Sequence, residues 1–457
     1  MRGIGVSLGV LAALLGSTAL VQAQSGGVSA AAGVIALSLP AVETGAFGTG
    51  DIDLPSEPTT TYGISFGGDA YIDLGQHGDF DVFIGASGFG AIASGTSSTA
   101  MELEGQGALV IPGYTTPTDY DITLTTNSVG LGGAVSANST TNQDGETNGV
   151  DLAPGTGAAF GWGVNPDDDF GTTPAFLFGG VFADSDDDRS GAFGAVADED
   201  GSILIAIGDL TGVVVTQDVT QHVAYYGGDI TLGLSGANGN VQLTGYAGPS
   251  YLFLGRDVVS TTTVDFPELG DDNATTGGVA SPLEFPMYSL TRDETIATHY
   301  VGGVAGLSAS TPVGEGMLLT IGGEGGLYAT HTTATGMETA SVFGGDPSPT
   351  PDPTEVANTI GLDLVDNSYA FTLGGNAALT VPVGQNMQIS FGAGAEYLSR
   401  VATLAGGGAP TITGLDSVGS GDDDGSVTYD GSEDLRPVIS YGDAWTLSGF
   451  LTLSGQF

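Results

Sequence analysis

The chain has no cysteine, no lysine and, beyond its first residues, no long apolar run. Without cysteine there is no disulfide, no Cys-ligated metal and no thiolate nucleophile. The 6 lysine-plus-arginine positions are all arginine and stand against 53 acidic residues, for a formal net charge of -47. So few cations cannot neutralise phosphates, which excludes a nucleic-acid partner. No run after residue 23 reaches the ~20 residues of a transmembrane helix, so any membrane crossing would have to use strands.

Glycine and apolar residues dominate what is present. The 457 residues include 79 glycines, well above the average share of about 7%. No Gly-X-Y period occurs, so the chain is not collagen-like. At 40% hydrophobic residues it is too apolar for a disordered chain. The composition therefore favours a folded, glycine-rich protein with an acidic surface.

Residues 1–23 have the organisation of a secretory signal peptide. Arg2 precedes an apolar run through Leu20, and the small-residue site Val21-Gln22-Ala23 precedes Gln24. We expect cleavage after residue 23 and export of residues 24–457. The alternative, an uncleaved anchor, is disfavoured because the run is short and rich in glycine and alanine.

Period-two alternation predicts strands over much of the mature chain. From Tyr62 to Leu74 the even-numbered residues are apolar or glycine and most odd-numbered residues are polar. A tight turn at 75–79 leads into a return strand, which makes a hairpin. A second hairpin turns at 237–240. Residues 307–328 and 377–398 repeat one another around a shared Pro-Val-Gly turn, so the hairpin with a long following loop is a repeated unit.

The last strand ends the chain on an aromatic residue. Between Trp445 and Phe457 the odd-numbered positions are apolar or glycine, and the even-numbered ones are polar except Phe450. This strand resembles the closing strand of the bacterial outer-membrane β-barrels, in which a C-terminal aromatic is part of the signal read by the insertion machinery. The resemblance implies the outer membrane of a Gram-negative cell as the location, Phe457 as the insertion signal, and outer-membrane lipid and that machinery as partners.

Short turns and long polar loops alternate along the chain. The long loops cover 256–294, 331–367 and 402–437, and barrels of this kind keep short turns in the periplasm. Because both termini then lie in the periplasm, the strand number is even. We predict an all-β, transmembrane, antiparallel up-and-down barrel of twelve strands with long acidic extracellular loops. The alternative is ten strands; in both cases residues 94–221 are partly a surface excursion from a single barrel domain.

Charged residues on the inward faces are the candidate functional site. The alternation turns six acidic side chains inward and places two arginines near the outer strand ends. An acidic lumen would favour cations, whereas the same acids could instead hydrogen-bond tyrosines and arginines in a plugged interior. The lumen-facing candidates are Asp69, Asp73, Asp81, Asp229, Glu324, Glu396, Arg256 and Arg400.

Aspartate runs at 184–188 and 422–424 have the alternation of calcium ligands but complete no calcium loop. Arg189 stands where the sharp-turn glycine belongs, and no bidentate glutamate follows at the twelfth position. We therefore expect no metal site and no cofactor, with weak binding of Ca²⁺ or another divalent cation by these loop acids as a hypothesis.

No catalytic constellation is marked in the sequence. The 4 histidines fall on separate hairpins, and the glycine-rich stretches do not precede helices as phosphate loops do. We expect that the protein is not an enzyme and has no catalytic residues. The C-terminal strands also resemble the autotransporter translocator barrel. The segment between residue 24 and Tyr62 is too short for the passenger of that family, which disfavours passenger export unless residues 94–221 are themselves the exposed part.

These features favour a narrow porin-like passive channel with a mild preference for cations. The first alternative is a closed barrel scaffold that displays acidic loops for adhesion or surface protection. The second is a secreted soluble acidic β-protein. The sequence leaves the oligomeric state undetermined.

Overall fold

The computed structural model describes most of the chain from Ser25 onward. None of the described residues forms a helix that is long and apolar enough to cross a membrane. The described residues are 25–42, 47–50, 59–115, 120–127, 132–139, 147–152, 158–164, 176–184, 189–197, 201–266, 285, 287–314, 316–343, 360–405, 412–414, 425–430 and 437–457.

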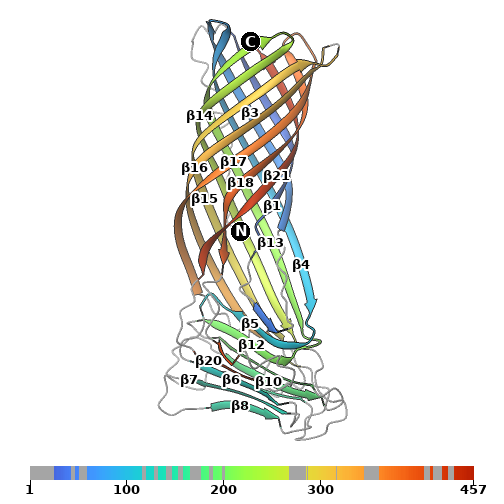
Figure 1. The fold of residues 1–457 in the computed structure, drawn as a ribbon, viewed down its shortest axis with the longest axis vertical. Helices are drawn as coiled ribbons and strands as arrows, with labels where there is room; N and C mark the ends of the chain where they lie inside the picture. The colour runs from blue at the N-terminus through green and yellow to red at the C-terminus, as the bar shows by residue number, and fades with distance from the viewer. Residues whose placement is uncertain are drawn as a thin grey trace.

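Ten long strands close into an antiparallel barrel (Figure 1). The ring closes because the first strand pairs on one side with the second and on the other with the last. Within the ring every strand therefore has a partner on both sides, and the sheet has no free edge at this level. In ring order the strands are β1 (Gly26–Leu39), β21 (Val438–Gln456), β18 (Met387–Ala405), β17 (Ile360–Pro382), β16 (Leu318–Phe343), β15 (Met287–Pro312), β14 (Val241–Asp265), β13 (Val214–Asn238), β4 (Phe80–Glu102) and β3 (Thr59–His77).

The strand number corrects the sequence-based prediction. The prediction of twelve barrel strands is wrong, and the alternative of ten is what the ring contains. The two ends of the segment 94–221 lengthen β4 to Glu102 and start β13 at Val214. Its apolar pieces do form strands, but these strands belong to smaller sheets outside the ring.

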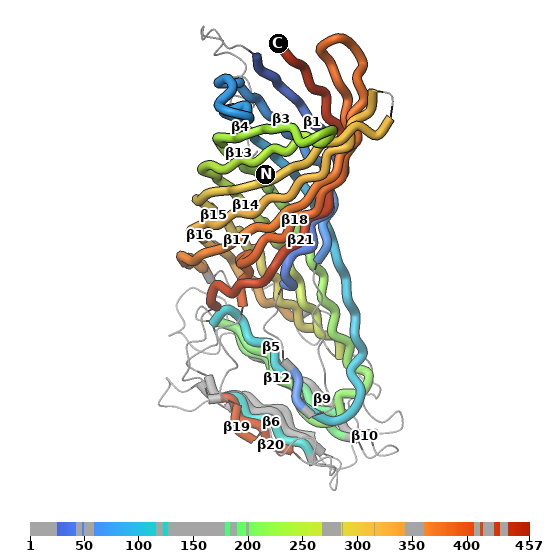
Figure 2. The backbone as a smooth tube through the Cα atoms, turned by 45° about the horizontal axis from the view of Figure 1, so that its top comes forward, coloured from blue at the N-terminus to red at the C-terminus, as the bar shows by residue number. Residues whose placement is uncertain are grey.

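Two smaller sheets, together called the cap here, lie across the end of the barrel opposite Phe457 (Figures 1 and 2). The first has six strands and the second has five. The first, in order, contains β2 (Phe47–Gly50), β5 (Gln106–Pro112), β12 (Ser202–Asp209), β11 (Arg189–Ala197), β10 (Phe176–Asp184) and β9 (Ala158–Val164). The second, in order, contains β19 (Ile412–Thr413), β20 (Gly425–Asp430), β6 (Tyr120–Asn127), β7 (Gly132–Ser139) and β8 (Thr147–Leu152).

The first cap sheet is buried on both faces. Leu204 and Ala206 of β12 pack with barrel residues such as Tyr288 and Leu290. The intervening isoleucines, Ile203, Ile205 and Ile207, pack against Ile122, Leu124, Val427 and Tyr429 of the second sheet. A strand covered on both faces is a continuous apolar run instead of an alternating one. This is why the cap strands lack the period of two that marks the barrel hairpins.

The outer face of the barrel carries an exposed apolar belt beside the short turns. Leu307 and Leu327 are 73% and 74% exposed, and Trp445 stands at the far side of the belt from Phe457. Beyond the belt the outward side chains become polar, as at Asp257 and Asp293. An exposed apolar surface of this extent suits a lipid hydrocarbon layer, which a tilted strand crosses with about 9–11 residues. The belt segments are 28–34, 62–74, 80–92, 226–234, 243–251, 301–307, 321–327, 369–379, 387–397 and 445–453.

Beyond the belt, β18 leaves the barrel wall. Its pairing with β17 ends at Thr372 and Leu398, and a bulge follows in which Arg400 has a left-handed φ of 58°. The continuing part of β18 stays paired with β21 and packs Ala402 and Leu404 onto inward residues of β15, β16 and β17. The end of this strand pair therefore fills part of the barrel interior.

Candidate functional site

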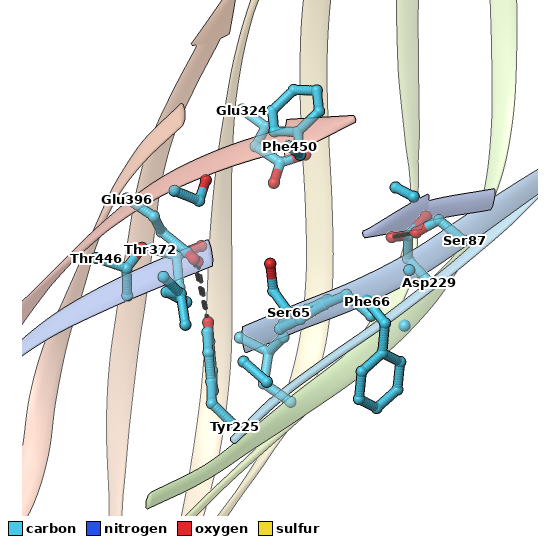
Figure 3. Close-up of a pocket in the computed structure, with 18 of the residues that line it drawn as sticks. Ser65, Phe66, Ser87, Tyr225, Asp229, Glu324, Thr372, Glu396, Thr446 and Phe450 are labelled. Atoms are coloured by element: carbon cyan, nitrogen blue, oxygen red, sulfur yellow. Dashed lines mark hydrogen bonds between the residues drawn. The ribbon is translucent and has the colours of Figure 1, made fainter. Parts of the chain in front are cut away.

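A cavity of about 910 Å³, called the vestibule here, lies inside the barrel and reaches the short-turn end. A second space of about 310 Å³ continues it inward and shares Asp229, Glu324 and Glu396 with it (Figure 3). All six acidic residues of the sequence-based set line the vestibule: Asp69, Asp73, Asp81, Asp229, Glu324 and Glu396. The ring thus brings together carboxylates from five different strands, β3, β4, β13, β16 and β18.

Hydroxyl groups from other strands hold these carboxylates. The Tyr246 hydroxyl donates to Glu324 Oε2 at 2.8 Å, and the Tyr225 hydroxyl reaches both oxygens of Glu396 at 3.2 Å (Figure 3). Ser87 donates to Asp229 in the same way. Among the described residues, no three His, Cys, Asp or Glu side chains come together as a metal site. The geometry supports a wall of separately held carboxylates.

A layer of buried apolar and tyrosine side chains, called the seal here, closes the inner end of these cavities. Tyr225 packs edge-on against Phe89 at 5.0 Å, and Tyr300 against Tyr328 at 6.3 Å, between ring centroids. Every ring strand except β3 contributes, and each buried member is at most 8% exposed. The seal consists of Ile35, Leu37, Leu39, Ala91, Ala93, Val223, Tyr225, Leu252, Leu254, Tyr300, Tyr328, Ala370, Leu398, Val401 and Ala444, with Phe89 packed against them.

Beyond the seal, a buried ionic cluster joins the barrel to the cap. Arg292 Nε of β15 donates to Glu338 Oε2 of β16 at 3.0 Å, and both side chains are buried. The same Glu338 oxygen accepts the Tyr114 backbone N–H at 2.7 Å, and its other oxygen accepts the Ser202 hydroxyl at 3.1 Å. Arg292 Nη2 also donates to the Pro112 carbonyl at 3.0 Å. These contacts, called the clasp here, fix the ends of β5 and β12 to the barrel wall.

Tyr114 completes the clasp. Its hydroxyl donates to Glu294 Oε1 at 2.8 Å, and the Arg292 guanidinium lies over its ring at 4.9 Å from the centroid. A Cβ on Gly113 would lie 2.3 Å from Glu338 Oε1, so the close approach of the carboxylate to this chain segment requires glycine. Burial raises the pKa of Glu294, against the opposing effects of Arg292 and the Tyr114 hydrogen bond.

The raised pKa of Glu294 predicts an unusual pH dependence. Because the folded-state pKa lies above the ordinary value of 4.5, the folded protein binds a proton that the unfolded chain releases. As the pH falls through that window, the unfolding free energy of the wild type should rise relative to Glu294→Gln, by about 1.4 kcal/mol per unit of pKa difference. Urea unfolding of both proteins between pH 7 and 4.5 measures this. A difference that stays constant or changes in the opposite direction would contradict it.

The two arginines of the sequence-based set lie in different surroundings. Arg256 is 1% exposed and lies beyond the seal, far from a mouth. Arg400 is exposed, with its guanidinium over the Tyr441 ring at 5.1 Å from the centroid. Phe457 is exposed and its backbone pairs with Gly26, and its role as an insertion signal stays a prediction. Arginines and lumen acids therefore form no single site.

The clasp was missed because the predicted loops begin too early. The ranges 256–294 and 331–367 contain the ends of β14, β15, β16 and β17, so these parts of the prediction are wrong. The alternation Arg292, Glu294, Ile296 continues the inward face of β15, which was the available signal. The aspartate runs at 185–188 and 422–424 lie outside the described residues, so divalent-cation binding there stays a hypothesis.

Comparisons with known proteins give structural likeness and no sequence relative. No protein family and no curated protein matches the chain. The outer membrane protease OmpT from Escherichia coli is 8% identical over 96% of this chain and 99% of its own, with a TM-score of 0.32. A FadL homologue of Pseudomonas aeruginosa is 8% identical over 94% and 90%, with a TM-score of 0.22, and OprB of Pseudomonas putida is 10% identical over 95% and 94%, with a TM-score of 0.15. The chain is thus similar in structure to bacterial outer-membrane β-barrels.

Proposed function

We propose that the protein is an outer-membrane β-barrel with a closed lumen, a scaffold that holds the cap and its acidic loops on the outer side of the membrane. The seal is the observation that carries this proposal, because it fills the barrel interior with buried side chains from nearly the whole ring. The clasp and the cap add a second closure beyond it. Adhesion and surface protection are the roles that such a scaffold suits.

The barrel supports a location and an orientation for this scaffold. The apolar belt suits a bilayer, and Ser25 and Phe457 lie together at the short-turn end, which in this architecture faces the periplasm. The cap then faces outward. We assign export to the predicted signal segment 1–23, with outer-membrane lipid and the barrel-insertion machinery as partners. The proposal includes no catalytic role.

The narrow cation-preferring channel is the weaker candidate. Its support is the vestibule, whose acidic wall would concentrate cations at one end of the barrel. Passage would still require a path through the seal, past the inserted end of β18 and through the cap. Small barrels fill with their own side chains, and this one does so over much of its length.

Planar-bilayer recording tests the closed scaffold. Refolded wild-type protein, with folding checked by heat-modifiable gel mobility, should give no channel events. Stable unitary steps whose cation selectivity falls in Asp229→Asn with Glu324→Gln would instead establish the channel and overturn the scaffold. Protease treatment of intact cells should cleave cap loops while the barrel fragment stays in the membrane fraction.

A further inference from the structure

A buried guanidinium without a carboxylate contact lies just beyond the seal. Arg256 Nη1 donates to the Ala402 carbonyl at 2.8 Å, and Nη2 donates to Gln221 Oε1 at 3.1 Å and to the Pro40 carbonyl at 3.5 Å. All three acceptors are neutral. A cation taken out of water without a counter-charge carries a large desolvation cost, so buried charges in proteins are normally paired.

Three hydrogen-bond donors in this region have no acceptor. Among the described residues, Arg256 Nε, Gln221 Nε2 and the Tyr300 hydroxyl are buried and lack a hydrogen-bond partner. They come from the inward faces of the adjacent strands β14, β13 and β15, and Tyr300 is near enough to act electrostatically on Arg256. A guanidinium and an amide nitrogen can only donate. Arg256 and Gln221 are hydrogen-bonded to each other, so their two free donors belong to neighbouring groups that one acceptor can serve.

The nearby carboxylates are already engaged elsewhere. Glu294 acts on Arg256 electrostatically, but its Oε1 accepts the Tyr114 hydroxyl at 2.8 Å on the cap side. Glu338 is held by Arg292, whose Nε lies 3.0 Å from its Oε2. Neither carboxylate therefore fills the position in front of Arg256 Nε.

We propose that Arg256, Gln221 and Tyr300 bind a small monovalent anion such as chloride inside the closed barrel. The anion accepts from the three free donors and places a negative charge in direct contact with Arg256, whose hydrogen-bond acceptors are otherwise neutral. Because Arg256 also donates to Ala402 and Pro40, the anion stabilises the contact between the end of β18, the chain after β1 and the wall at β14. This is a structural ion, and its presence does not depend on whether the barrel conducts.

Substituting the amide by a carboxylate gives the sharpest test. Gln221→Glu keeps the oxygen that accepts from Arg256 and adds the missing negative charge, so it should replace the anion. At constant ionic strength, replacing gluconate with chloride should raise the thermal midpoint of the refolded wild type by about 2 °C or more. The same replacement should leave the thermal midpoint of Gln221→Glu unchanged. Gln242→Glu, which adds the same charge in the vestibule, should keep the full chloride effect. No chloride effect in wild type, or an undiminished one in Gln221→Glu, overturns the proposal.

Crystals grown in bromide give an independent readout if Gln221→Glu does not fold. An anomalous bromide peak within hydrogen-bond distance of Arg256 Nε is expected in the wild type. A water molecule at that position, with no anomalous signal, would show that the donors are satisfied by solvent and would overturn the anion assignment.

Discussion

Glu338→Gln should destabilise the junction of barrel and cap by about 3–5 kcal/mol, the usual cost of breaking a buried ion pair from one side. The amide keeps the shape of the side chain but leaves Arg292 charged and buried beside a neutral group. It also weakens the acceptor for Tyr114 N–H and for the Ser202 hydroxyl, which hold β5 and β12 against the wall. The cap should therefore loosen first.

Urea unfolding of the refolded protein measures the loss, and limited proteolysis of the cap locates it. Asp363→Asn is the matched control, because Asp363 is exposed on the outer face of β17 and its neutralisation should change stability by less than about 0.5 kcal/mol. Replacing both partners, Arg292→Met with Glu338→Leu, removes the unpaired Arg292 charge and should recover part of the loss. The recovery should be incomplete, because buried Glu294 then loses the nearby guanidinium. Equal stability of Glu338→Gln and wild type would mean that the clasp does not hold the cap.

Gly302→Ala should cost about 3 kcal/mol or more, at the upper end of the range for overpacked sites. A Cβ at this inward position of β15 would lie 1.9 Å from the Leu327 carbonyl oxygen on the adjacent strand β16. The obstruction is backbone, so relief requires the two strands to separate and their hydrogen bonds to lengthen. We expect loss of the heat-modifiable folded form or a clear fall in its urea midpoint.

Gly323→Ala is the control for this substitution. Gly323 lies in the belt on β16, and a Cβ there would meet its nearest neighbour, the Gly374 carbonyl oxygen, at an ordinary 3.5 Å. The same change in composition should therefore leave the barrel nearly as stable as the wild type. Similar losses in both variants would trace the effect to the general conformational freedom of glycine and not to the close strand approach.

The belt half of the barrel could be predicted because it separates two media. Lipid outside and a polar, glycine-rich interior impose a strict alternation, so the faces of Tyr62–Leu74 and of the closing strand can be assigned residue by residue. The inward position of Asp69 and Glu324 follows from the same alternation. The seal does not, because Tyr225, Tyr300 and Tyr328 meet only once the ring curvature is set.

Beyond the belt, the environment changes and the pattern fails. Arg292 and Glu338 lie on inward faces that the cap covers. In the sequence, such buried charged residues cannot be distinguished from the polar residues of an exposed loop. The run Ile203–Ile207 of β12 is apolar at every position, because the barrel covers one face of this strand and the second cap sheet covers the other. The prediction of twelve strands assigned two membrane strands to residues 94–221. The contacts that would correct the count join residues far apart in the chain.

The second cap sheet also constrains the order in which the molecule can be assembled. Its strands β6 and β20 pair Thr126 with Gly425, and they come from the excursion between β4 and β13 and from the one between β18 and β21. In the proposed orientation, both excursions cross the membrane before this pairing can form, and the second is followed directly by the closing strand. Completion of the cap and closure of the ring are therefore coupled late events in biogenesis. A chain stalled before β20 would carry an unfinished sheet edge, a state that proteases at the cell surface would recognise.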